Sequence, residues 1–162
     1  LWAAREDLYV PCPTPAEAVA QALRDSRTPV VLLDLGDNVG GGSAGDGTVI
    51  LCELLRQGAT KAVVMLYAPA EVETCTAAGV GATVTLTVGG KVDDRHGEPV
   101  EVAGVVTLLH DGIYTEREVR HGGKRTNHMG PTALVELPGG NLLALTTLRH
   151  PPFSLGALTC LG

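Results

Sequence analysis

The sequence predicts an α/β protein, in which a small parallel three-layer α/β unit is followed by an antiparallel β-rich part. Up to residue 88, apolar runs of strand length alternate with amphipathic segments of helix length, as in strands joined by crossover helices. From Gly89 onward, glycine, proline and charged turns separate the strands, which favours antiparallel pairing. The chain has 162 residues, 44% of them hydrophobic, so it can bury one substantial core.

The first thirteen residues predict a linker, because Pro11 and Pro13 fix the backbone and remove hydrogen-bond donors. The chain begins without a methionine and ends within what looks like an interrupted element, so we expect a fragment of a longer protein. The expected organisation is a linker from a missing N-terminal domain over 1–13 and a C-terminal domain over 14–162. That domain divides into an α/β part over 14–88 and a β-rich part over 89–162.

Three helices are predicted from start and stop signals. Thr14 and Glu17 have the spacing of a capping box, with Pro15 at the first helical position. The other two helices each end before a glycine, which is typical of a helix C-terminus. The predicted helices are Pro15 to Arg27, Thr48 to Gln57, and Pro69 to Ala78.

Six strands are predicted from apolar patterns. The first, Val30–Leu35, is a continuous apolar run between Pro29 and Gly36, the form of a strand buried on both faces of a parallel sheet. The other five segments are Ala62–Tyr67, Ala82–Val88, Val100–Leu109, Thr132–Leu137 and Leu142–Leu148.

Charge and composition exclude several classes of protein. The formal net charge is −6, so the basic surface of a duplex-binding protein is missing and no nucleic-acid partner is expected. No apolar run approaches the roughly 18 to 20 residues that cross a bilayer, and no signal peptide is visible, which favours a soluble, cytoplasmic protein without a membrane partner. Four scattered cysteines without a Cys-x-x-Cys pair disfavour a zinc ribbon.

A glycine-rich loop at residues 36–47 is the strongest functional signal, because it leaves the carboxyl end of a predicted strand and opens a helix. It satisfies G-x-G-x-x-G, but no acidic residue ends the next strand and Asp46 stands where a phosphate-binding lysine is needed, which disfavours a nucleotide. Its carboxylates and backbone N–H groups suit a peptide, sugar or amine-bearing ligand. The candidate binding residues are Asp37, Asn38, Gly40, Gly41, Gly42, Gly45 and Asp46.

A purely structural interpretation of this loop stays open. Asp37 and Asn38 then brace a tight turn, and Asp46 or Ser43 caps the following helix.

Five histidines, at positions 96, 110, 121, 128 and 150, supply weaker signals. Asp94 and His96 are candidate metal ligands, but a site needs a third ligand. Lys124 to His128 form a basic polar turn, in which Arg125 can grip a carboxylate and His128 can also bind substrate. No serine or cysteine nucleophile motif is visible.

Several segments together resemble the C-terminal domain of the microcystinase C (MlrC) family of zinc metallopeptidase-like proteins. The match follows nearly the whole chain in order, and its most specific part is the Asp-Asn-x-Gly-Gly-Gly-x-x-Gly-Asp signature. Many relatives have proline where Val39 and Ala44 stand here. The matching segments are Leu33–Thr48, Ala78–Leu86, Gly89–Lys91, Arg95–Gly97 and Met129–Ala133.

This resemblance implies a role in a metal-dependent peptide or amide hydrolase. The zinc ligands are expected chiefly in the N-terminal metal domain, which is the expected partner in the same chain. On this resemblance, the present chain is expected to form one wall of the active-site cleft and to position a small peptide or amide substrate. By itself it is expected to be inactive and to hold no tightly bound cofactor. The alternative is a non-catalytic α/β module that binds a small ligand or a protein.

Overall fold

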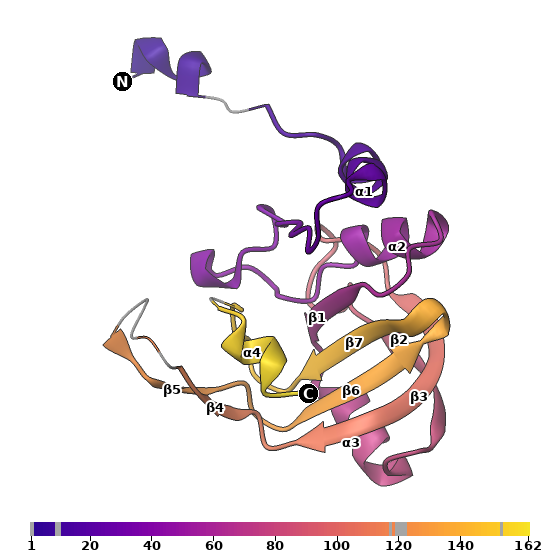
Figure 1. Cartoon of the computed structure of the whole chain (residues 1–162). Coiled ribbons are helices and arrows are strands. Elements are labelled where there is room, and N and C mark those ends of the chain that lie inside the picture. Colours follow the sequence, from indigo (N-terminus) through magenta and orange to yellow (C-terminus); the bar gives the residue numbers. More distant parts are fainter. Residues whose placement is uncertain (1, 9–10, 117, 119–122, 153) are drawn as a thin grey trace.

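The computed structural model describes residues 2–8, 11–116, 118, 123–152 and 154–162. Its centre is a five-stranded mixed sheet with the order β1-β7-β6-β3-β2, and a separate hairpin pairs β4 with β5 (Figure 1). Only β1 and β7 run parallel; the other neighbours are antiparallel. The strands are β1 (Val63–Tyr67), β2 (Thr83–Val88), β3 (Val100–His110), β4 (Ile113–Thr115), β5 (Thr126–His128), β6 (Thr132–Leu137) and β7 (Asn141–Thr146).

The α/β class is confirmed, but the strands do not divide into a parallel and an antiparallel unit. β1 and β2 form opposite edges of one sheet, and β7 inserts beside β1. The side chain of Asn141 explains this position. It donates to the Ala59 carbonyl at 2.8 Å and accepts from the Ala62 N–H at 3.0 Å, so the start of β7 is held against the start of β1.

The predicted strand Val30–Leu35 was wrong, because this segment is an irregular coil. The side chains of Val31, Leu33 and Leu35 are 71%, 76% and 71% exposed. An apolar run indicates that a segment favours burial, but it does not say what buries it. The basic turn was also misassigned, since Thr126–His128 is strand β5.

The helices follow their sequence signals closely. In the capping box, Thr14 Oγ1 accepts from the Glu17 N–H and the Glu17 carboxylate accepts from the Thr14 N–H. Among the described residues, no helix has the length and apolar content needed to cross a membrane. The helices are α1 (Pro15–Arg24), α2 (Val49–Arg56), α3 (Pro69–Ala78) and α4 (Gly156–Thr159), with 3₁₀ turns at Trp2–Ala4, Glu6–Leu8, Val39–Gly41 and Pro138–Gly140.

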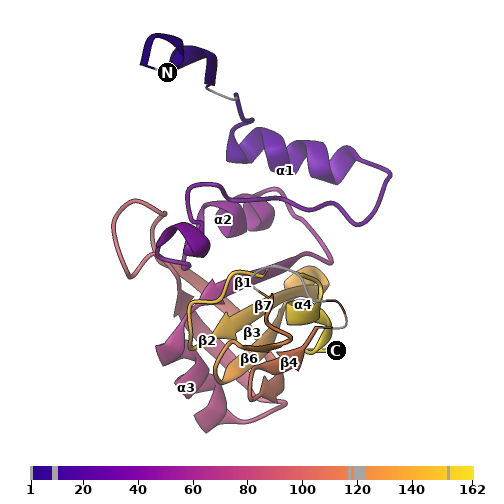
Figure 2. The same cartoon turned by 90° about the vertical axis from the view of Figure 1, so that its left-hand side faces the viewer.

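The sheet buries both of its faces. On one face, Val72 and Cys75 of α3 and Leu51 of α2 pack against inward side chains of all five strands. On the other face, Tyr114, Met129 and residues of the α4 region pack against Ala144 and Leu134. α1 contacts α2 and lies on its outer side, and the N-terminal 3₁₀ turns lie beyond α1, away from the sheet (Figures 1 and 2).

Candidate functional site

The glycine-rich loop is braced by two of its own side chains. The Asp37 carboxylate accepts from the Gly45 and Gly47 N–H groups, both at 2.6 Å, and from Ser43 Oγ at 2.9 Å. Asn38 Oδ1 accepts from the Gly40 N–H at 2.9 Å. The loop shape therefore depends on these two polar side chains, as the structural interpretation predicted.

Many of the backbone N–H groups of this loop donate to acceptors within the loop itself. Besides the groups bound by Asp37 and Asn38, the N–H groups of Gly41, Gly42 and Ser43 donate to the carbonyls of Asn38 and Val39. These donors are already used within the protein, so a ligand cannot use them without breaking a hydrogen bond of the loop. Only Gly42 of the three consecutive glycines has a positive φ, at 91°.

A second loop, at residues 89–99, is fastened to the glycine-rich loop by Asp46. The Asp46 side chain is buried, and its Oδ2 accepts from the N–H groups of Lys91 at 2.8 Å and Val92 at 3.1 Å. The Thr48 N–H also donates to the His96 carbonyl at 2.9 Å. Asp46 thus holds in place the loop that carries His96.

His96 joins the two loops through its side chain. Its Nδ1 lies 2.7 Å from Asp93 Oδ1, and its Nε2 lies 3.0 Å from Ser43 Oγ and 3.2 Å from the Gly36 carbonyl. The hydrogen bond to Asp93 raises the pKa of His96 and favours the imidazolium form. We assign Nδ1–H as the donor to Asp93, with Nε2–H directed at Ser43 and Gly36, because that assignment satisfies both neighbours.

Replacing Asp93 is expected to lower the His96 pKa towards the ordinary value of about 6.5. An NMR titration of the His96 imidazole in Asp93→Asn measures this shift. Asp94→Asn is the matched control, because the adjacent Asp94 is not among the groups that raise the His96 pKa. His150, whose pKa burial lowers, should titrate unchanged in both variants. Equal His96 pKa values in both variants would contradict this assignment.

The sign of the pH dependence follows from the raised pKa. The pairing of the His96 imidazolium with Asp93 stabilises the fold fully at pH values below the unfolded-state pKa of about 6.5. This stabilisation is lost as the pH rises through the higher pKa that His96 has in the folded protein.

A shallow cavity of about 400 Å³ lies between the two loops. The Arg149 Nε donates to the Ala44 carbonyl at 2.9 Å, and its guanidinium carbon lies 4.9 Å from the Tyr67 ring centroid. Within the described part of the chain, the Arg149 Nη atoms and the Arg95 guanidinium make no hydrogen bond. The lining residues are Gly36, Gly41, Gly42, Ser43, Ala44, Val92, Asp93, Arg95, His96 and Arg149.

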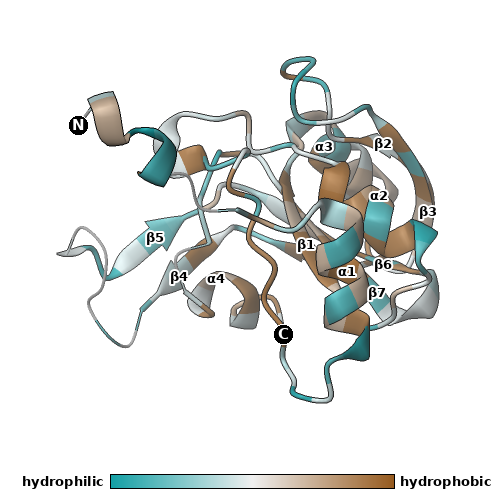
Figure 3. Ribbon diagram, turned by 90° about the horizontal axis from the view of Figure 1, so that it is seen from above, coloured by the Kyte–Doolittle hydropathy of each residue, from teal (hydrophilic) through white to brown (hydrophobic). Residues whose placement is uncertain are grey.

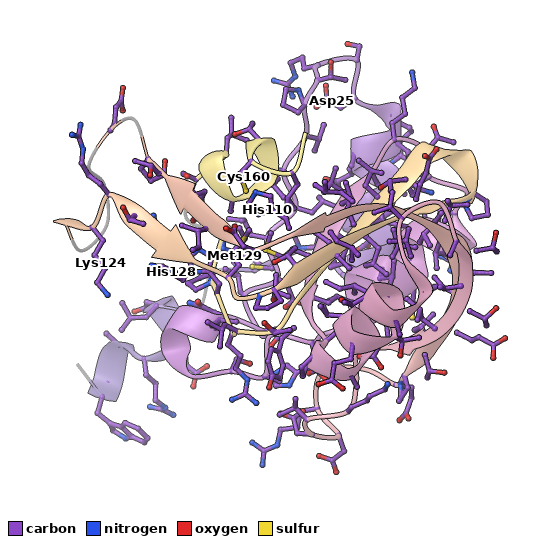
Figure 4. The ribbon with its side chains drawn as sticks, turned by 90° about the horizontal axis from the view of Figure 1, so that it is seen from below. Asp25, His110, Lys124, His128, Met129 and Cys160 are labelled. Carbon is purple, nitrogen blue, oxygen red and sulfur yellow. The ribbon has the colours of Figure 1, made fainter. Side chains whose placement is uncertain are left out.

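The structure places the predicted site residues in three groups. Gly41, Gly42 and His96 line the cavity. Asp37, Asn38, Gly40, Gly45 and Asp46 support its walls from behind. Arg125 and His128 belong to the β4–β5 hairpin, and Figure 4 shows His128 and Lys124 there. His121 lies outside the described residues.

Sequence reasoning missed Arg149 and Arg95 as binding candidates. No motif marks Arg149, which meets the glycine-rich loop across 105 positions of the sequence. Arg95 stands next to the predicted His96, so the charged segment Asp93 to His96 was the one available signal.

The described residues do not hold a metal site. No group of three or more His, Cys, Asp or Glu side chains gathers in that part of the chain. Both ring nitrogens of His96 are engaged by Asp93, Ser43 and Gly36, so this histidine is not placed to coordinate a metal.

Comparison with known proteins finds similarity over most of this chain. Residues 32–162 match the family model described as "MlrC C-terminus". Microcystinase C from Sphingomonas sp. is 35% identical over 86 residues, which are 52% of this chain and 17% of that protein. A crystal structure from Mesorhizobium sp. BNC1, provisionally assigned as a metallopeptidase, matches with a TM-score of 0.89 and 26% identity. The structural match covers 100% of the present chain and 32% of the Mesorhizobium chain. The chain thus spans at most about a third of these two relatives.

Proposed function

Because this chain belongs to the MlrC C-terminus family, we propose that it forms one wall of the active-site cleft in a metal-dependent peptide or amide hydrolase. The observation that carries the proposal is the cavity between the glycine-rich loop and the 89–99 loop. Hydrolases of this class use zinc to activate water for attack on an amide carbonyl. The described residues here do not fit that ion, so we assign zinc binding to the part of the full-length protein outside this chain.

In this proposal, the chain contributes substrate positioning. The side chains at the cavity that have donors without a partner among the described residues are those of Arg95 and Arg149, through their guanidinium groups. Stacking on Tyr67 and the bond to Ala44 pre-organise the Arg149 guanidinium, which suits bidentate binding of a carboxylate. A peptide or amide that carries a carboxylate near the scissile bond fits these donors best.

Gly41→Ala in the full-length protein tests whether the loop is a substrate wall. Gly41 lines the cavity, its φ is not positive, and an added Cβ would meet only the Asn38 amide at 3.9 Å, so the fold should tolerate it. We expect kcat/KM for amide hydrolysis to fall about tenfold or more, because a small displacement of a bound substrate is costly. Zinc content and thermal midpoint should stay unchanged.

Arg149→Ala tests the same wall through its charge. KM should rise about tenfold or more, since a hydrogen bond to a charged group contributes roughly 1.5–3 kcal/mol. Arg56→Ala is the matched control, because Arg56 pairs with Glu53 on α2 and does not line the cavity.

Wild-type kinetics in folded Gly41→Ala and Arg149→Ala would refute the proposal. A full-length protein that binds a small polar ligand without metal-dependent amidase activity would favour the binding module instead.

A further inference from the structure

The coil between α1 and the glycine-rich loop exposes four large apolar side chains within six residues. Val31, Leu33 and Leu35 are at least 71% exposed, and Val30 is 42% exposed. Figure 3 shows this stretch in the brown of apolar residues, after the hydrophilic loop that follows α1. Several large apolar side chains exposed within one short segment favour an interaction site.

The backbone of the same segment is also without hydrogen-bond partners in the part of the chain that the structure describes. Among the described residues, no N–H or carbonyl group of Val30–Leu35 makes a hydrogen bond. The first bonds occur at its end, where Asp34 Oδ1 accepts from the Gly36 and Asp37 N–H groups. The segment therefore has the composition of a strand that is buried on both faces. Its backbone donors and acceptors are also available for pairing with another strand.

We propose that Val30–Leu35 adds as a strand to a sheet edge in the part of the full-length protein that precedes this chain. This inference rests on the proposed function and names the surface through which the two parts meet. The family description places the match at a C-terminus, and the chain covers only 32% and 17% of the two relatives' lengths. Those relatives therefore carry a large preceding part.

The position of the segment supports this occupant over a second copy of the chain. A covalently linked partner acts at an effective concentration of about millimolar, so it outcompetes a separate molecule of similar affinity. Gly36, the next residue after the segment, lines the cavity. A sheet edge seated on Val30–Leu35 would therefore lie beside the cavity and complete the cleft.

Amide hydrogen exchange in the full-length protein tests the strand addition directly. We expect alternate N–H groups within Val31–Leu35, those that face the neighbouring strand, to exchange at least about a hundredfold more slowly than in an unstructured chain. Exchange at the intrinsic rate would overturn the proposal. Protection that disappears on dilution, together with dissociation of a dimer, would assign the surface to a second copy and overturn it as well.

A pair of variants separates docking from a general effect of charge. In the full-length protein, Leu33→Asp should abolish the protection of its neighbours and expose the junction to protease. Val80→Asp is the matched control, because Val80 is 62% exposed in the loop between α3 and β2 and should keep both properties. Unchanged protection in Leu33→Asp would refute the docking surface. These readouts do not involve catalysis, so the proposed function can fail with Gly41→Ala while the docking result stands.

Discussion

Gly89→Ala is expected to lower the free energy of unfolding by about 2–5 kcal/mol, from left-handed strain plus overpacking. Gly89 has a φ of 62°, and a Cβ there would overlap the Asp46 carbonyl and Thr48 Cγ2. Both atoms belong to the segment that leads into α2, and the Asp46 carbonyl accepts from the Gly90 N–H. The clash therefore falls on the junction between the glycine-rich loop and the 89–99 loop, where neither backbone can move without losing hydrogen bonds.

Gly58→Ala is the matched control for this prediction. Gly58 has a similar φ of 68°, but an added Cβ would meet nothing within 4 Å. Its cost should be the backbone strain alone, roughly 1–2 kcal/mol. Urea unfolding followed by circular dichroism measures both variants. Equal losses would show that the close approach at Gly89 contributes nothing.

Asp46→Ala should lower the free energy of unfolding by about 2–4 kcal/mol, because two hydrogen bonds to a carboxylate are lost. The side chain is only 2% exposed, so the cavity left by the carboxylate is not readily filled by water. The N–H groups of Lys91 and Val92 would lose their acceptor, and the 89–99 loop would lose its attachment. Since this loop carries His96, we also expect weaker order in the cavity wall.

Asp46→Asn tests the reason for that loss. The amide oxygen can accept from the same two N–H groups, and the other carboxylate oxygen, Oδ1, has no hydrogen-bond partner among the described residues. The asparagine variant should therefore retain most of the stability, within about 1 kcal/mol of wild type. If Asp46→Asn and Asp46→Ala lower the free energy of unfolding equally, the hydrogen bonds that Asp46 accepts from Lys91 and Val92 do not stabilise the protein.

These results would also distinguish the residues that hold the predicted site in shape from the residues that contact the substrate. Asp37 and Asp46 were candidates for binding a ligand, and the structure engages both with backbone N–H groups. Their replacement should act first on stability. Gly41 and Arg149 line the cavity, so their replacement should act first on kinetics.

Much of the local structure could be predicted because its causes lie within a few residues. Thr14 and Glu17 form the capping box of α1 within one helical turn. α3 spans Pro69–Ala78 as predicted, between a proline that favours a helix start and a glycine that ends it. Strand β6 also has its predicted bounds, and Asn38 braces its turn through a neighbour two positions away.

The site was only partly predictable, because its contacts join distant positions. Ser43 and His96 meet across 53 positions, and Ala44 and Arg149 meet across 105. Neither pair has a characteristic spacing, so residue types alone did not connect them. The Gly-rich pattern located one wall of the cavity, and the second wall emerged only when Asp46 was seen to hold the 89–99 loop.

By itself, the sequence determined the α/β class, most helices and strands, and the loop on which a site is built. Tertiary structure decided which strands are neighbours: Asn141 binds Ala59 and Ala62 and thereby places β7 beside β1. It also showed that Val30–Leu35 has the pattern of a buried strand and no partner within the described chain. The physical reason is that periodicity specifies which faces favour burial, whereas the partner that buries them is selected by packing between segments far apart.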